Sequence, residues 1–188
     1  MALKPLCVSV LALLVERPMH PYEMHRVLLE RREDRFVKIR LGSLYHTVER
    51  LCDELLLEAV GTEREGNRPE RTTYAITPAG REAVDARVRE LISRPVREYP
   101  HFPLALSEAH NISASEAAAD LRQYVAALDD DIDELRALLR AARERGTPET
   151  YWVAGDYLLT TAVAQRDWIT TLIHRIETKD LIWQPDLP

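Results

Sequence analysis

The 188-residue chain lacks the residue patterns on which most enzyme and metal sites depend. Its six glycines form no phosphate-binding loop, and no nucleophile stands beside a base or a carboxylate pair. We therefore expect no enzyme activity. The two cysteines and six histidines are scattered along the chain, so we expect no metal site and no cofactor.

Long apolar runs are also missing. No segment approaches the roughly 20 apolar residues that a membrane span requires, so we expect no membrane partner. The run from Cys7 to Val15 has no signal-peptide cleavage site and continues into charged residues. Cys7 and Cys52 fall on predicted core helices, and we interpret them as buried, reduced thiols of a cytoplasmic protein.

The excess of positive charge found in many nucleic-acid-binding proteins is absent, since the net charge is −6. The acidity is uneven. Residues 1–95 hold 16 Lys and Arg against 15 Asp and Glu, whereas residues 96–188 hold 9 against 16. DNA binding by the first half would therefore depend on a local patch and on dimerisation rather than on bulk charge.

What is present begins with three amphipathic helices. Apolar residues recur at helical spacing from Leu3 to Leu14, and a second, short helix opens at Pro21 with an inner face of Met24, Val27 and Leu28. A third helix is predicted by apolar residues at intervals of four, three and four: Leu44, Val48, Leu51 and Leu55. Its other face carries Ser43, Tyr45, His46, Glu49 and Arg50.

Two strand-like runs follow the third helix. They are Glu58 to Glu65 and Glu70 to Thr77, on either side of the turn-rich group Gly66-Asn67-Arg68-Pro69. Thr77 and Pro78 then provide the cap and first residue of a fourth helix. Three helices, a hairpin and a helix, in this order, predict a winged helix-turn-helix domain.

This arrangement favours DNA binding, because the major groove admits one α-helix whose polar face can reach base edges. Lys38 and Arg40, just before the third helix, could meet phosphates together with the first amides of that helix. Arginines of the hairpin could enter the minor groove, namely Arg64, Arg68 and Arg71. For any single arginine the alternative is an ordinary solvated side chain.

Three blocks of this domain form a recognisable set: Pro18-Met19-His20-Pro21-Tyr22-Glu23-Met24, Leu41-Gly42-Ser43-Leu44-Tyr45, and the run from Gly66 to Gly80. Together they resemble the signature of PadR-type transcriptional regulators. The resemblance implies DNA contacts by Tyr22, Ser43, Tyr45, Arg68 and Arg71, although Tyr22 could instead pack on the first helix. The full set of DNA-binding candidates is Tyr22, Lys38, Arg40, Ser43, Tyr45, His46, Arg50, Arg64, Asn67, Arg68 and Arg71.

The chain departs from the family pattern at several positions. The family usually has glycine where Pro21 stands, Ser-Pro where Arg40-Leu41 stands, proline at His46, and glycine at Leu55 or Leu56. We expect the added arginine and histidine to shift base preference. The missing glycine predicts a less abrupt end to the third helix.

Two long helices are predicted for the second half. A connector of residues 95–112 contains Pro95, Pro100 and Pro103 and separates a DNA-binding domain, residues 1–94, from a helical domain, residues 113–188. Ser113 and Glu116 form a capping-box pattern, Gly146 ends the first long helix, and Thr147-Pro148 starts the second. Their apolar seams predict an antiparallel hairpin.

A two-helix hairpin cannot bury both seams alone, so it must pack on the first domain or on a second copy. The sequence leaves both options open. A C₂ dimer would match an inverted-repeat operator, and this half resembles the longer dimer-forming domain of one PadR subfamily. On that basis we assign the dimer interface to Leu121, Val125, Leu128, Ile132, Leu135, Leu158, Ile169 and Leu172.

All three tryptophans, Trp152, Trp168 and Trp183, fall in the second half. In some relatives, aromatic residues of this domain line a site for phenolic or planar drug-like molecules, so the resemblance implies Trp152 and Trp168 as effector candidates. The alternative is packing at an interface. The acidic run from Asp129 to Glu134 points to several sides of a helix, which is typical of a solvated face rather than a cation site.

The sequence therefore predicts a mainly α protein with a small two-stranded β wing: a winged helix-turn-helix domain followed by a long helical hairpin for dimerisation. The predicted function is sequence-specific transcriptional regulation. We expect a repressor that binds a double-stranded DNA operator as a homodimer and is released by a small aromatic ligand. The alternative is a winged-helix protein-interaction module without sequence-specific DNA binding.

Overall fold

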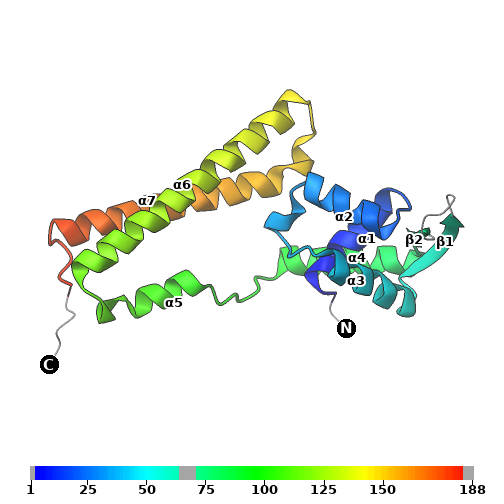
Figure 1. Ribbon diagram of the computed structural model, residues 1–188, viewed down its shortest axis with the longest axis horizontal. Helices are drawn as coiled ribbons and strands as arrows, with labels where there is room; N and C mark the ends of the chain where they lie inside the picture. The colour runs from blue at the N-terminus through cyan, green and yellow to red at the C-terminus, as the bar shows by residue number, and fades with distance from the viewer. Residues whose placement is uncertain (1–2, 64–70, 184–188) are drawn as a thin grey trace. The chain divides into compact units, whose positions relative to one another are not determined.

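The computed structural model describes residues 3–63 and 71–183, which form two compact units, Met1–Arg97 and Glu98–Pro188. The first unit contains α1 (Pro5–Glu16), α2 (Pro21–Glu30), a 3₁₀ turn η1 (Glu33–Arg35), α3 (Leu41–Asp53), β1 (Leu57–Glu63), β2 (Arg71–Ile76) and α4 (Pro78–Ser93) (Figure 1). The second contains α5 (His101–Ser107), η2 (Ala109–Asn111), α6 (Ala114–Glu144), η3 (Glu149–Tyr151) and α7 (Val153–Glu177). The predicted fold class is confirmed.

The core of the first unit is built around α1, which packs against α2, α3, α4 and β2. The predicted inner faces of α2 and α3 are buried, among them Met24, Leu28, Leu44 and Leu51. Each fully buried aliphatic side chain contributes roughly 1.5–3 kcal/mol relative to exposure. This packing holds the polar face of α3 on the outside of the unit.

The end of α3 differs from the prediction. The helix stops abruptly because Leu55 takes a left-handed conformation, φ +59°, in the place where glycine usually stands. The amide of Leu55 donates to the carbonyl of Cys52, and that of Leu56 donates to the carbonyl of Leu51, both at 2.9 Å. These are the two hydrogen bonds of a Schellman motif, so the expected gradual ending was wrong.

The strands β1 and β2 form an antiparallel hairpin with an irregularity between Ala59 and Gly61. An isolated bridge from Met19 to Tyr74 ties the hairpin to the start of α2. Thr77 caps α4 by accepting a hydrogen bond from the amide of Gly80, as predicted. A Cβ atom at Gly80 would lie 2.2 Å from the carbonyl oxygen of Leu56, so this close approach requires glycine.

The predicted connector contains a short helix, α5, in spite of its prolines. Pro103 is the third residue of α5, where a missing amide costs nothing because first-turn amides have no partner within the helix. The sequence analysis treated the prolines of this stretch as helix breakers and therefore did not predict α5. A proline in the first turn does not interrupt a helix.

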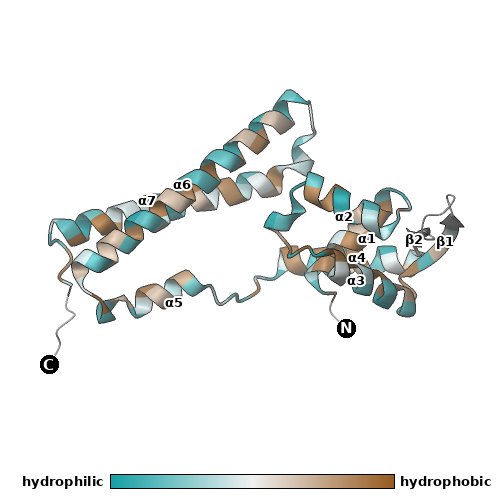
Figure 2. Ribbon diagram, viewed as in Figure 1, coloured by the Kyte–Doolittle hydropathy of each residue, from teal (hydrophilic) through white to brown (hydrophobic). Residues whose placement is uncertain are grey.

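The second unit is an antiparallel hairpin of α6 and α7, whose alternating apolar and polar stretches are visible in Figure 2. The capping box at Ser113 and Glu116 is present, and Gly146, with φ +67°, ends α6 as predicted. Pro148 starts only the turn η3, and α7 begins at Val153. Arg166 on α7 donates to Asp129 on α6 at 3.0 Å, so part of the acidic run is paired within the hairpin.

Both cysteines are free thiols, but only Cys7 is buried; Cys52 is half-buried, because its position on α3 lies at the edge of the core. The prediction that both are buried was wrong for Cys52. Among residues 3–63 and 71–183, no helix combines the length and the apolar content needed to cross a membrane.

Candidate nucleic-acid interface

The third helix presents a polar face to solvent at the position where a recognition helix would meet DNA. Ser43, Tyr45, His46 and Glu49 are all exposed, while Leu44 and Val48 between them are buried. His46 has 84% of its side chain accessible, against 68% for Glu49. Its Nδ1 lies 3.4 Å from a carboxylate oxygen of Glu49, so an imidazole and a carboxylate stand together on this face.

The N-terminus of α3 is suited to an anion. Arg40 occupies the cap position but its side chain makes no capping hydrogen bond, and the first turn contains no acidic residue. Free amides and the positive end of the helix dipole therefore face solvent there. Lys38 and Arg40 are both exposed beside them, so two cationic side chains and the amides lie at one end of the helix.

A histidine that the sequence analysis did not select connects α2 to this face. The Nδ1 of His20 accepts a hydrogen bond from the amide of Tyr22 at 3.1 Å and so caps α2. Its ring meets that of Tyr45 edge to face, with 6.4 Å between centroids. His20 thus fixes the exposed Tyr22 relative to Tyr45. A histidine directly before Pro21 was a signal for a cap that sequence analysis could have used.

An ion pair stabilises the corner between α1 and α2. Arg17 donates to a carboxylate oxygen of Glu23 at 2.6 Å, and this hydrogen bond lowers the pKa of Glu23. Glu23 lies in the first turn of α2, where a carboxylate is also favoured by the helix dipole. Glu23 therefore supports the start of α2 and is not available as a free acid.

Arg50 does not lie with the other α3 candidates. Its Nη2 is 2.5 Å from the sulfur of Cys7 on α1, and its Nε is 3.8 Å from Glu54. The side chain of Arg50 therefore points toward α1. Of the described candidates, Tyr22, Lys38, Arg40, Ser43, Tyr45 and His46 are exposed, whereas Arg50 is half-buried.

The wing is described only in part. Arg71 begins β2, but its side chain lies outside the described residues, as do Arg64, Asn67 and Arg68. The strands pair Glu63 with Arg71, and residues 64–70 lie outside the described part of the chain.

The residues assigned to the dimer interface lie between α6 and α7 of the single chain. Leu121, Ile132, Leu135 and Ile169 are buried there, and Val125, Leu128, Leu158 and Leu172 are half-buried. Their packing therefore stabilises the hairpin itself. Apolar side chains that stay exposed include Val88, Leu91 and Ile92 on α4 and Val153, Tyr157 and Trp168 on α7.

The two effector candidates differ in their surroundings. The indole of Trp152 donates to the carbonyl of Thr147 at 3.1 Å, and Arg143 stacks over its ring at 4.7 Å from the centroid. Both contacts hold the turn between α6 and α7. Trp168 is 55% exposed on α7. Neither Trp152 nor Trp168 lines the cavity formed by α5, η2 and α6, and no cluster of metal-ligating residues is found within the described part of the chain.

Comparison with known proteins agrees with this geometry. Residues 10–86 match the family model of the PadR-like transcriptional regulators. A search of curated proteins gave no significant match.

Solved structures resemble the chain over nearly its whole length. PadR of Bacillus subtilis in complex with operator DNA is 16% identical, with a TM-score of 0.79 over 94% of this chain and 99% of the other. PadR-like regulator BC1756 of Bacillus cereus is 18% identical, with a TM-score of 0.67 over 93% and 99%. B. subtilis PadR in complex with p-coumaric acid is 14% identical, with a TM-score of 0.76 over 93% and 99%. At these identities the likeness establishes the fold.

Proposed function

We propose that this chain binds a double-stranded DNA operator sequence-specifically, which the match of residues 10–86 to the family model of the PadR-like transcriptional regulators supports. The observation that carries the proposal is the exposed polar face of α3, which begins at an uncapped, cation-flanked N-terminus beside Tyr22. The amides, Lys38 and Arg40 would bind phosphates and fix the helix in the major groove. Ser43, Tyr45, His46 and Glu49 would then reach base edges.

The protein would act as a homodimer and as a repressor in the cytoplasm. One recognition helix reads only a few base pairs, and a two-fold dimer doubles the contact while matching an inverted repeat with half-sites about 10 base pairs apart. Occupying such an operator excludes polymerase from it. A relative was crystallised with operator DNA and, separately, with p-coumaric acid, which supports a small aromatic effector for this chain as well.

The test is selection of bound sequences from a random DNA pool by the full chain. We expect an inverted repeat. Glu49→Gln should change the preferred base at one position of each half-site, because a carboxylate accepts from cytosine whereas an amide pairs with adenine. An unchanged base preference in this variant would show that Glu49 does not contact bases. If the wild type shows no sequence preference even at low salt, the result would instead support the protein-interaction module.

A paired variant separates phosphate binding from base recognition. Lys38→Ala/Arg40→Ala should weaken binding to all sequences alike and reduce the salt dependence by about one unit of slope for each phosphate that these side chains neutralise. Arg89→Ala, which removes an exposed cation from α4, is the control and should change neither quantity.

A further inference from the structure

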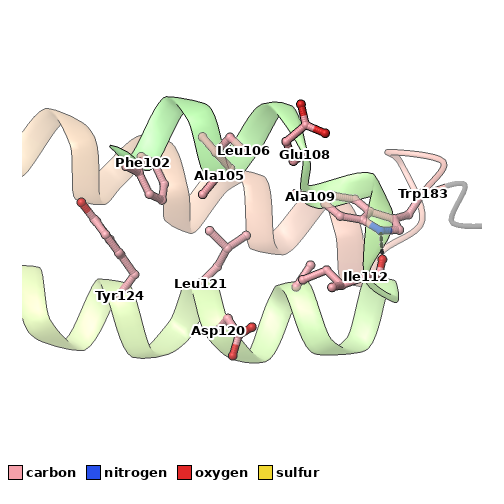
Figure 3. A pocket seen from close by; sticks show the side chains of 11 residues that line it. Phe102, Ala105, Leu106, Glu108, Ala109, Ile112, Asp120, Leu121, Tyr124 and Trp183 are labelled. Atoms are coloured by element: carbon pink, nitrogen blue, oxygen red, sulfur yellow. Dashed lines mark hydrogen bonds between the residues drawn. The ribbon is translucent and has the colours of Figure 1, made fainter. Parts of the chain in front are cut away.

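The second unit contains a cavity that shares only Leu121 with the residues assigned to DNA binding or to the dimer interface. Its volume is about 320 Å³, and it lies among α5, η2, the first turns of α6 and Trp183 (Figure 3). Phe102 and Tyr124 stand at one end and Trp183 at the other, with Leu106 and Leu121 between them. Neither Trp152 nor Trp168 lines it.

The aromatic walls are held by contacts of their own. The rings of Phe102 and Tyr124 stack with 4.3 Å between centroids. The Tyr124 hydroxyl accepts a hydrogen bond from Gln165 at 3.3 Å, and the indole of Trp183 donates to the carbonyl of Ile112 at 2.8 Å. Rings fixed in this way form a cavity before any ligand arrives, which lowers the entropic cost of binding.

The charges around the cavity have one sign. Glu108 and Asp120 lie at opposite edges, and none of the eleven lining residues is a lysine, arginine or histidine. Residues 98–188 as a whole hold 8 Lys and Arg against 16 Asp and Glu. Aromatic ring faces also carry negative potential and attract cations. The site therefore disfavours anions and favours a positive charge.

We propose that this cavity binds a small planar aromatic cation. The ring system would lie between the aromatic ends of the cavity, and the charged group would stay at one edge, near either Glu108 or Asp120. The volume is at the lower end of the roughly 300–1,000 Å³ typical of small-molecule sites, so the ligand has one or two fused rings. Its role as an effector rests on the proposed regulatory function, whereas its binding does not.

Three naphthalene probes of nearly equal size test the proposal by calorimetry on the full chain without DNA. They are 2-naphthylmethylammonium, 2-naphthylmethanol and 2-naphthoate. We expect the cation to bind at least about 10-fold more tightly than the anion, with the alcohol between them. Glu108→Gln/Asp120→Asn should reduce this preference several-fold and leave binding of the alcohol unchanged. The control Asp130→Asn/Glu144→Gln removes the same charge from exposed positions of α6 outside the cavity and should leave the preference intact.

A tryptophan pair locates the site. Trp183→Ala should weaken binding of all three probes, whereas Trp168→Ala should not, because Trp168 does not line the cavity. The proposal is overturned if Trp168→Ala weakens probe binding and Trp183→Ala does not, or if the wild type prefers 2-naphthoate. It is also overturned if no probe binds to the wild type and Trp183→Ala dissociates a dimer. DNA selection is measured separately, so loss of DNA binding with retained probe binding would contradict the regulatory function and leave the cavity site standing.

Discussion

Leu55 shows how a single residue can hold a conformation that its side chain disfavours. Its left-handed backbone is fixed by the two hydrogen bonds that end α3 and by Thr77, whose hydroxyl donates to the Leu55 carbonyl at 2.9 Å. The amide of Thr77 also donates to the carbonyl of Leu56. Apolar spacing predicted Leu44, Val48 and Leu51 as core correctly but included Leu55, which is 75% exposed. The reversal depends on contacts with α4, which helical spacing does not encode.

Leu55→Gly is expected to raise the free energy of unfolding by about 0.5–1 kcal/mol, because glycine adopts positive φ without steric cost. Denaturant unfolding followed by circular dichroism measures the change. Gly146→Ala is the counterpart, since it places a Cβ atom at another left-handed helix end, and it should lower stability by a similar amount. A destabilised Leu55→Gly variant would mean that the exposed leucine side chain contributes contacts that outweigh its backbone strain.

At the scale of elements, local polar motifs predicted the ends of helices more reliably than prolines did. The capping box of α6 followed directly from Ser113 and Glu116: Ser113 accepts from the Glu116 amide at 3.2 Å, and its own amide donates to the Glu116 carboxylate at 3.0 Å. Both partners are three residues apart, so the sequence contains the whole motif. The helix α5 was not predicted, because the connector of residues 95–112 contains three prolines. Whether a proline interrupts a helix depends on its distance from the first residue of that helix.

Ser113→Ala should lower the free energy of unfolding by about 1 kcal/mol at neutral pH. Hydrogen bonds from the Ser113 side chain and amide lower the pKa of Glu116 from its ordinary value. The folded state therefore binds fewer protons there than the unfolded state, and this contribution is present at pH values above the pKa of an unfolded glutamate and lost as pH falls through the folded pKa. The difference between wild type and Ser113→Ala should shrink in acid, and a difference independent of pH would show that Glu116 takes no part in the cap.

At the scale of the whole molecule, periodicity identified the buried faces of α6 and α7 but not what covers them. A helical stripe shows which side chains avoid water, and the partner is set by tertiary packing. In the structure that partner is the other helix of the same hairpin, since Ile132 and Ile169 have no exposed surface. A dimer would then need apolar side chains that remain exposed, such as Val88, Leu91 and Ile92, which follow one another around α4 at spacings of three and one.

We therefore expect Ile92→Asp to affect assembly and Ile132→Asp to affect folding. Ile92 is 82% exposed, so a charge there costs the folded monomer little but would disrupt a dimer that covers this face. Light scattering should show folded monomers, with unchanged helical circular dichroism. Ile132→Asp buries an unpaired charge inside the hairpin and should reduce helical content itself, at a cost of several kcal/mol. An Ile92→Asp variant that remains dimeric would exclude α4 from the interface and point to the exposed face of α7 around Tyr157 and Trp168.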